Sequence, residues 1–132
     1  MFKDSSNIYE INTRIWLGEL SLKYKKTIRL SNIPAAEIKK IKDFGFDAVW
    51  LMGIWEPSNV SRSIALRNKF LINECRVSLP DLAPADIVSS CYAIKEYKVS
   101  YLLGTKDDVL HFKNTMNKLG IKLILDFVPN HL

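Results

Sequence analysis

Two stretches of the chain are almost continuously apolar. They are FDAVWLMGIW at residues 46–55 and IKLILDFV at residues 121–128. Runs of this kind are typical of strands buried on both faces of a parallel sheet. A third stretch, IYEINTRIWL at residues 8–17, mixes β-branched and aromatic residues with polar ones. This mixture predicts a strand with a following turn, so three strands are expected.

The segments before the two apolar stretches have the spacing of amphipathic helices. Pro34 suits the first turn of one helix, and Gly45 ends it. Thr105 and Asp108 have capping-box spacing at the start of the other, which ends at Gly120. The apolar stripes are Ile38, Ile41 and Phe44 in the first helix, and Val109, Phe112, Met116 and Leu119 in the second.

The connections between these elements differ in length and character. Residues 21–32 are polar and basic, which predicts a loop. Residues 57–88 are interpreted as an insertion between the second strand and the next helix. Within it, residues 64–77 fit a helix, and PDLAPAD at 80–86 predicts a turn-rich break.

The order strand, helix, strand, insertion, helix, strand predicts an α/β fold with parallel strands and right-handed crossovers. A doubly wound sheet and a TIM (β/α)8 barrel both fit this order. No GxGxxG or GxxxxGK[ST] motif follows the first strand, so nucleotide binding is not expected. Polar residues instead follow the strands, as in the active sites of barrels. They are Asn12, Arg14, Trp55, Glu56, Asp126, Asn130 and His131. We therefore expect the first three strands and intervening helices of an incomplete TIM barrel.

Composition narrows the possible partners. The 132 residues have the length of one ordinary domain, with a net charge of +5. The cations are spread along the chain and not gathered in one stripe, so no nucleic-acid partner is expected. Cys75 and Cys91 lack the spacing of metal ligands.

The sequence offers no sign of a membrane or an export signal. No apolar stretch approaches the roughly 20 residues that span a bilayer. The N-terminal MFKDSSNIYE has no apolar segment of the kind found in signal peptides. We expect a cytoplasmic protein without a membrane partner.

Four stretches, in order, resemble the α-amylase family, glycoside hydrolase family 13. DFVPNH at 126–131 matches the D-x-V-x-N-H motif that follows the family's third strand. Residues 8–17 resemble the first strand, and FGFDAVWLMGIWEPS at 44–58 resembles the second strand with its flanks. SSCYAIKEYKVSYLLGT at 89–105 resembles the stretch usually written SPYxxxDYxxxxxxxGT. The resemblance covers about residues 7–132 and implies a barrel enzyme.

The resemblance also implies roles for single residues. His131 matches a histidine that hydrogen-bonds the sugar next to the broken bond, and Tyr92 matches a tyrosine that stacks on that sugar. Asp126 matches an aspartate that supports the catalytic groups. Asn130 matches an asparagine that binds calcium or braces the loop in many members. Calcium takes about six to eight oxygens, of which Asn130 offers one, so calcium is only a possible cofactor.

The chain departs from the family's pattern close to Tyr92. Cys91 stands where a proline is usual, Ala93 where an aspartate is common, and Glu96 replaces the aspartate before Tyr97. These differences leave the substrate specificity open.

The resemblance implies a retaining glycosidase acting on α-glucosidic bonds of starch-like glucans or maltooligosaccharides. Such enzymes need two carboxyl groups about 5–5.5 Å apart. The family carries them after its fourth and fifth strands, which this sequence does not include. We therefore expect residues 1–132 to be an N-terminal fragment of a catalytic domain, inactive by itself. An α-glucan transglycosylase, a non-catalytic sugar-binding or interaction module using Tyr92, Trp55 and His131, and an unrelated (β/α) enzyme are the alternatives.

Overall fold

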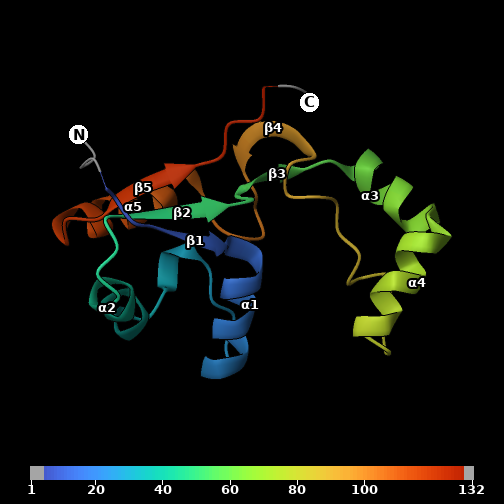
Figure 1. Cartoon of the computed structure of the whole chain (residues 1–132), viewed down its shortest axis with the longest axis horizontal. Coiled ribbons are helices and arrows are strands. Elements are labelled where there is room, and N and C mark those ends of the chain that lie inside the picture. The colour runs from blue at the N-terminus through green and yellow to red at the C-terminus, as the bar shows by residue number, and fades with distance from the viewer. Residues whose placement is uncertain (1–4, 130–132) are drawn as a thin grey trace. The chain divides into compact units, whose positions relative to one another are not determined.

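The structure is a computed structural model that describes residues 5–129 (Figure 1). Its elements are, in order, β1 (Ile8–Asn12), α1 (Thr13–Tyr24), η1 (Leu30–Asn32), α2 (Ala35–Asp43), β2 (Ala48–Met52), β3 (Trp55–Pro57), α3 (Asn59–Arg67), α4 (Lys69–Ser78), β4 (Ile94–Val99), α5 (Lys106–Lys118) and β5 (Lys122–Leu125). The chain forms two compact units. The sheet unit comprises the residues up to Ile54 and Lys98–Phe127, and the insert unit comprises Trp55–Tyr97 and the residues from Val128 on.

The sheet unit contains a parallel sheet in the order β1-β2-β5. Helices lie between consecutive strands of this sheet, as crossover connections between parallel strands require. The predicted α/β class and parallel sheet are confirmed. The sheet is compatible with part of a barrel.

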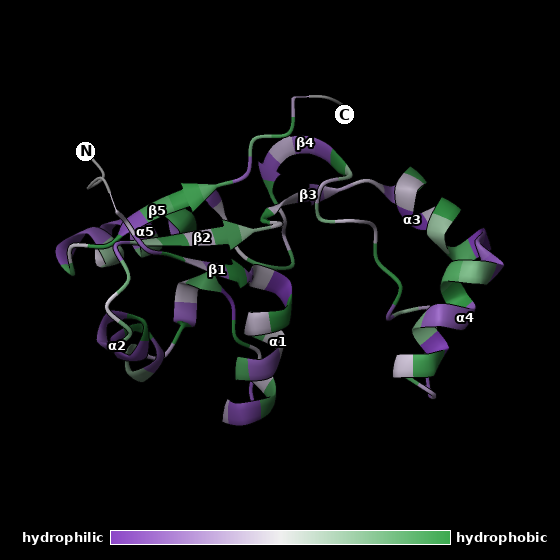
Figure 2. Ribbon diagram, viewed as in Figure 1, coloured by the Kyte–Doolittle hydropathy of each residue, from purple (hydrophilic) through white to green (hydrophobic). Residues whose placement is uncertain are grey.

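The two faces of this sheet differ in burial. Val49 and Leu51 of β2 are fully buried, and Ile11, the register partner of Leu51, is 5% exposed. They form a core with buried apolar residues of the helices, which are Leu17 and Leu20 of α1, Ile41 of α2, and Val109, Phe112 and Met116 of α5. Side chains alternate between the faces of a strand. The opposite face carries Ile8, which is 49% exposed, and Trp50, which is partly exposed. Figure 2 shows that β2 and β5 are nonetheless largely hydrophobic.

The first strand is shorter than predicted, because a helix begins directly after it. The Asn12 side chain caps α1 by accepting a hydrogen bond from the Ile15 amide at 3.3 Å. Residues 13–17, predicted as the end of the strand and the following turn, are therefore helical, and Arg14 lies on a helix and not on a strand. The predicted loop at 21–32 is also wrong in part, since α1 continues to Tyr24 and η1 begins at Leu30.

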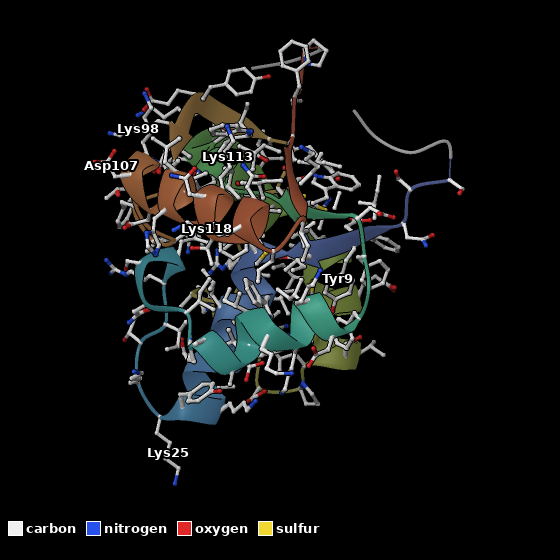
Figure 3. All side chains as sticks on the ribbon, turned by 90° about the vertical axis from the view of Figure 1, so that its left-hand side faces the viewer. Tyr9, Lys25, Lys98, Asp107, Lys113 and Lys118 are labelled. Atoms are coloured by element: carbon white, nitrogen blue, oxygen red, sulfur yellow. The ribbon has the colours of Figure 1, made fainter. Side chains whose placement is uncertain are left out.

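The end of α1 is marked by a residue in the left-handed conformation. Lys25 has φ of 51°, and its amide donates to the carbonyls of Leu22 and Ser21. Its side chain points away from the body of the fold (Figure 3).

The predicted strand at 46–55 is in fact two strands. β2 ends at Met52, and Gly53 follows with φ of +74°, a value that glycine adopts without a Cβ penalty. Trp55 then begins β3, which pairs with β4 in a separate two-stranded sheet. Neither β3 nor β4 was expected as a strand of its own.

The predicted helix at 64–77 is divided into α3 and α4. The Asn68 side chain accepts from the Leu71 amide at 3.1 Å, so it caps α4 in the middle of the predicted span. The turn-rich break at 80–86 agrees with the absence of helix and strand there. Arg62 of α3 donates to the carbonyls of Ile87 and Pro84 at 2.9 and 2.8 Å, which joins the helix to the segment before β4.

The two predicted helices of the sheet unit, α2 and α5, are confirmed with their predicted ends. Pro34 precedes α2, and Thr105 and Asp108 form a reciprocal capping box at α5. Phe44 was expected in the core, but it is 57% exposed. In the described part of the chain, no helix combines the length and the apolar character needed to cross a membrane.

Candidate functional site

The Asp126 carboxylate is buried at the end of β5, where it is 7% exposed. Its Oδ1 accepts a hydrogen bond from the indole nitrogen of Trp50 at 2.7 Å, and its Oδ2 accepts one from the Gly53 amide at 2.6 Å. Both donors come from β2 and the residue after it. Buried carboxylates are costly unless they are paired with donors, and here each oxygen has one.

The register of the sheet explains how Trp50 reaches this carboxylate. Trp50 pairs with Ile124, and Leu51 pairs with Leu125, so Asp126 follows on the same face as Trp50, one step toward the strand ends. The indole and the carboxylate therefore lie next to each other on the face of the sheet opposite the core. This places Asp126 at the carboxyl end of a parallel strand, where barrel enzymes build their sites.

A third hydrogen bond lies at the same carboxyl ends of the strands. The fully buried Thr13 donates its hydroxyl to the Met52 carbonyl at 2.8 Å. Thr13 is the first residue of α1, so this bond joins the end of β1 to the end of β2. The carboxyl ends of the three strands are thus held by Thr13 and Asp126, of which only Asp126 was predicted.

Tyr92 lies in the insert unit, two residues before β4. Its amide donates to the Ser90 hydroxyl at 3.2 Å, and the residue is 37% exposed. An exposed aromatic ring of this kind can stack on a sugar. The role in sugar stacking stays a prediction for Tyr92.

The predicted residues Asn130 and His131 lie outside the described residues. The segment that leads to them is held at Val128, which is 8% exposed and donates its amide to the Tyr97 hydroxyl at 2.7 Å. The Tyr97 ring packs edge-on against Trp55, with ring centroids 5.4 Å apart. Trp55 and Glu56, expected among the polar residues after the second strand, are both in β3.

No metal site is found in the described part of the chain. Among residues 5–129, no three His, Cys, Asp or Glu side chains lie together in a way that could hold an ion. The possible calcium ligand Asn130 is not among these residues, so calcium binding stays a prediction.

A second buried carboxylate lies apart from the strand ends. Glu37 of α2 is 6% exposed and accepts from the Tyr24 hydroxyl at 2.7 Å and from Lys23 of α1. Lys40 lies 3.4 Å from its other oxygen. The hydrogen bonds from Lys23 and Tyr24 lower the pKa of Glu37 from 4.5 to about 2. The same contacts raise the pKa of both Lys23 and Tyr24. Glu37 therefore joins α1 to α2, which the sequence pattern did not indicate.

Comparison with known proteins identifies a family. The family described as alpha amylase, catalytic domain, matches residues 35–132, which include Tyr92 and the whole DFVPNH segment. No curated protein matches the chain. Because the match covers most of the sequence, the resemblance seen in the motifs is confirmed. The chain belongs to the alpha-amylase catalytic domain family.

Proposed function

We propose that the chain contributes the first three barrel strands of a catalytic domain that acts on α-glucosidic bonds of starch-like glucans or maltooligosaccharides. In this proposal the two carboxylates of a retaining mechanism come from strands other than these three. The 132 residues supply part of the sugar-binding surface and no nucleophile. The chain alone is accordingly proposed to be inactive, and cytoplasmic.

The buried Asp126 carboxylate carries this proposal. Burying a carboxylate is costly, and the Trp50 indole and the Gly53 amide offset this cost by donating to its two oxygens. The two donors at 2.7 and 2.6 Å hold it in one orientation. Groups fixed in this way before substrate arrives are what electrostatic support of a reaction requires.

Tyr92 and His131 are proposed to contact the sugar next to the bond that is broken. The Tyr92 ring offers a flat apolar surface to the C–H face of a pyranose. The His131 imidazole offers a hydrogen-bonding nitrogen for a sugar hydroxyl. Together they would give affinity for a glucosyl unit without contributing chemistry.

Titration of the purified chain with maltoheptaose, followed by isothermal calorimetry, tests this proposal. We expect weak binding that Tyr92→Ala lowers about tenfold, a loss of about 1.4 kcal/mol, because the apolar ring surface for the pyranose is removed. Tyr101→Ala is the matched control, since Tyr101 is a 68% exposed tyrosine outside the proposed site. Cellohexaose, with β-linked glucose, is expected to bind less well. Equal binding of both sugars, or an equal loss in the two variants, would contradict the proposal.

A second assay tests the proposed inactivity. Maltoheptaose incubated with the chain is expected to be unchanged when products are separated by chromatography. Shorter sugars whose release disappears in the His131→Ala variant would show that residues of this chain perform the chemistry. Longer sugars would identify a transglycosylase.

A further inference from the structure

We propose that the pocket lined by residues of β1, α1 and α2 is a separate binding site for a single neutral sugar ring. The pocket belongs wholly to the sheet unit, and its lining does not include Asp126. The class of ligand is inferred from the side chains of the pocket. That the ring is an α-glucosyl unit rests on the proposed function.

Three aromatic side chains supply flat apolar surface to this pocket. They are Tyr9 of β1, Trp16 of α1 and Phe44, which follows α2. The Tyr9 and Phe44 rings meet edge-on with centroids 5.5 Å apart, and Tyr9 lies beside α2 (Figure 3). Phe46 stacks on Tyr9 at 5.0 Å, and Phe112 packs edge-on against Trp16 at 6.3 Å. Because each ring is restrained by another ring, little side-chain freedom is lost when a ligand binds.

The exposure of Phe44 gives the pocket its apolar wall. Phe44 was expected in the core, yet it is 57% exposed and lines the pocket. Leu20 and Ile41, which are 4% and 3% exposed, add buried apolar surface to the same lining. A pyranose can place its apolar C–H face against such a surface, as aromatic side chains favour.

Four charged side chains complete the lining, and their charges balance. Lys23 donates to one oxygen of Glu37, and Lys40 lies 3.4 Å from the other. An ammonium group has three donors, so both lysines keep donors for a ligand. Their side chains are 48% and 55% exposed. Glu19 is exposed and has no hydrogen-bond or ionic partner among residues 5–129, so its two oxygens can accept.

This combination of groups favours a neutral ligand over an ion. An anion would gain from the lysines but would be repelled by Glu19, and an organic cation would meet the opposite situation. A pyranose carries no charge, and its hydroxyls can both accept from ammonium groups and donate to a carboxylate. The cavity volume of about 290 Å³ lies just below the roughly 300–1,000 Å³ of sites for larger ligands, which suits one ring.

Titration of the full 132-residue chain with methyl α-D-glucopyranoside tests the inference, with the indole N–H signal of Trp16 followed by NMR. The chain has three tryptophans, and the Trp16→Phe variant assigns the signal. We expect a saturable shift with a dissociation constant in the millimolar range, retained in the Tyr92→Ala chain. A signal that does not move, or that moves without saturation, would overturn the inference.

Two variants with matched controls locate the site. Phe44→Ala should weaken binding of the glucoside about fivefold, because the exposed ring is lost. Phe70→Ala, at a 75% exposed phenylalanine of the insert unit, should leave the affinity unchanged. Glu19→Ala should weaken binding about tenfold, because a charged acceptor is lost. Glu10→Ala removes an exposed carboxylate of β1 outside the lining and is its control.

The glutamate variants decide the question if Phe44→Ala does not fold. An effect of Glu19→Ala no greater than that of Glu10→Ala would contradict the proposed site. Inorganic phosphate and choline, titrated in the same way, test the class of ligand. Weaker responses to both ions than to the glucoside support a sugar site. A response of Trp16 to either ion at lower concentration would show that the pocket is an ion site.

The two proposals fail in different ways. If Trp16 responds to the glucoside while Tyr92→Ala and Tyr101→Ala lose equal affinity for maltoheptaose, the proposed function fails and the pocket stands as a sugar site. If Tyr92→Ala alone weakens maltoheptaose binding and Trp16 does not respond to the glucoside, the proposed function stands and the inference about the pocket is wrong.

Discussion

The Trp50 indole and the Asp126 carboxylate are joined by a hydrogen bond of 2.7 Å that runs from β2 to the residue after β5. Two residues 76 positions apart in sequence therefore share one contact at the carboxyl ends of the strands. One oxygen of Asp126 accepts from the indole, and the other accepts from the Gly53 amide, so both buried oxygens have a donor. It makes Asp126 important to stability as well as to the proposed function.

Asp126→Ala is expected to lower the free energy of unfolding by about 2–3 kcal/mol, because it leaves two donors without their acceptor. Urea unfolding followed by circular dichroism measures this loss. Asp81→Ala, which removes an exposed carboxylate, should cost less than about 0.5 kcal/mol. A loss no greater than that of the control would mean that the two hydrogen bonds contribute little to folding.

The contacts of Glu37 predict that the free energy of unfolding decreases at low pH. The pKa of Glu37 is about 2 in the folded chain and 4.5 as its ordinary value. A lowered folded pKa gives stability that is fully present above pH 4.5 and is lost as the pH falls toward 2. The Glu37→Gln chain should lack this part of the acid transition and be about 1–2 kcal/mol less stable at pH 7.

This contribution of Glu37 is tested by measuring the unfolding free energies of the wild-type and Glu37→Gln chains from pH 7 to pH 2. The difference between the two chains should shrink as the pH falls below 4.5. Lys39→Gln is a useful control, because Lys39 and Asp43 form an exposed ion pair of 2.6 Å on the same helix. A constant difference between wild type and Glu37→Gln across the whole range would contradict the assignment.

The capping box at α5 predicts that removal of the Thr105 side chain destabilises the helix. Thr105 accepts from the Asp108 amide at 3.2 Å, and Asp108 accepts from the Thr105 amide at 2.7 Å. Thr105→Ala removes the first of these bonds and should cost about 1 kcal/mol. Thr27→Ala, at an exposed threonine outside any helix, serves as the control in thermal unfolding. Equal midpoints for the two variants would exclude a role for the cap.

The left-handed backbone of Lys25 predicts a substitution that stabilises the chain. Its φ of 51° lies in the left-handed region, where a residue with a Cβ is strained and glycine is not. Lys25→Gly should therefore stabilise the chain by roughly 0.5–1 kcal/mol, as glycine does at the ends of helices. Lys26→Gly, one position further on, is the matched control and should be neutral or destabilising. Destabilisation by Lys25→Gly would show that the lysine side chain contributes contacts that outweigh the strain.

Helices α2 and α5 were predictable because their signals are local. A proline or a capping threonine marks the start, a glycine follows the end, and three or four apolar residues form the stripe. The failures occurred where local signals compete. Ile15 and Trp16 favour a strand by composition, but the Asn12 cap starts a helix there. Gly53 breaks the strand, but the apolar residues on both sides of it favour one continuous strand.

The candidate site was likewise predictable only where its signal is local. Asp126 could be identified from its place in the DFVPNH motif. Its donors, Trp50 and Gly53, could not, because a partner 73 to 76 residues away depends on the pairing of β2 with β5. Tyr97 was missed for a related reason. Its contacts with Val128 and Trp55 depend on the pairing of β3 with β4, and β3, with three residues, is too short to show a periodic pattern.

The pairing of Trp50 with Ile124 has a consequence for how such a chain can change in length. Side chains alternate along a strand, so one residue gained or lost between Ala48 and Trp50 would turn the indole to the helix side and remove the donor of Asp126. Residues 59–78 form helices with no buried side chain, so gains and losses there leave the sheet untouched. In related chains, insertions and deletions should therefore accumulate in α3 and α4. The number of residues between β1 and Gly53 should stay the same.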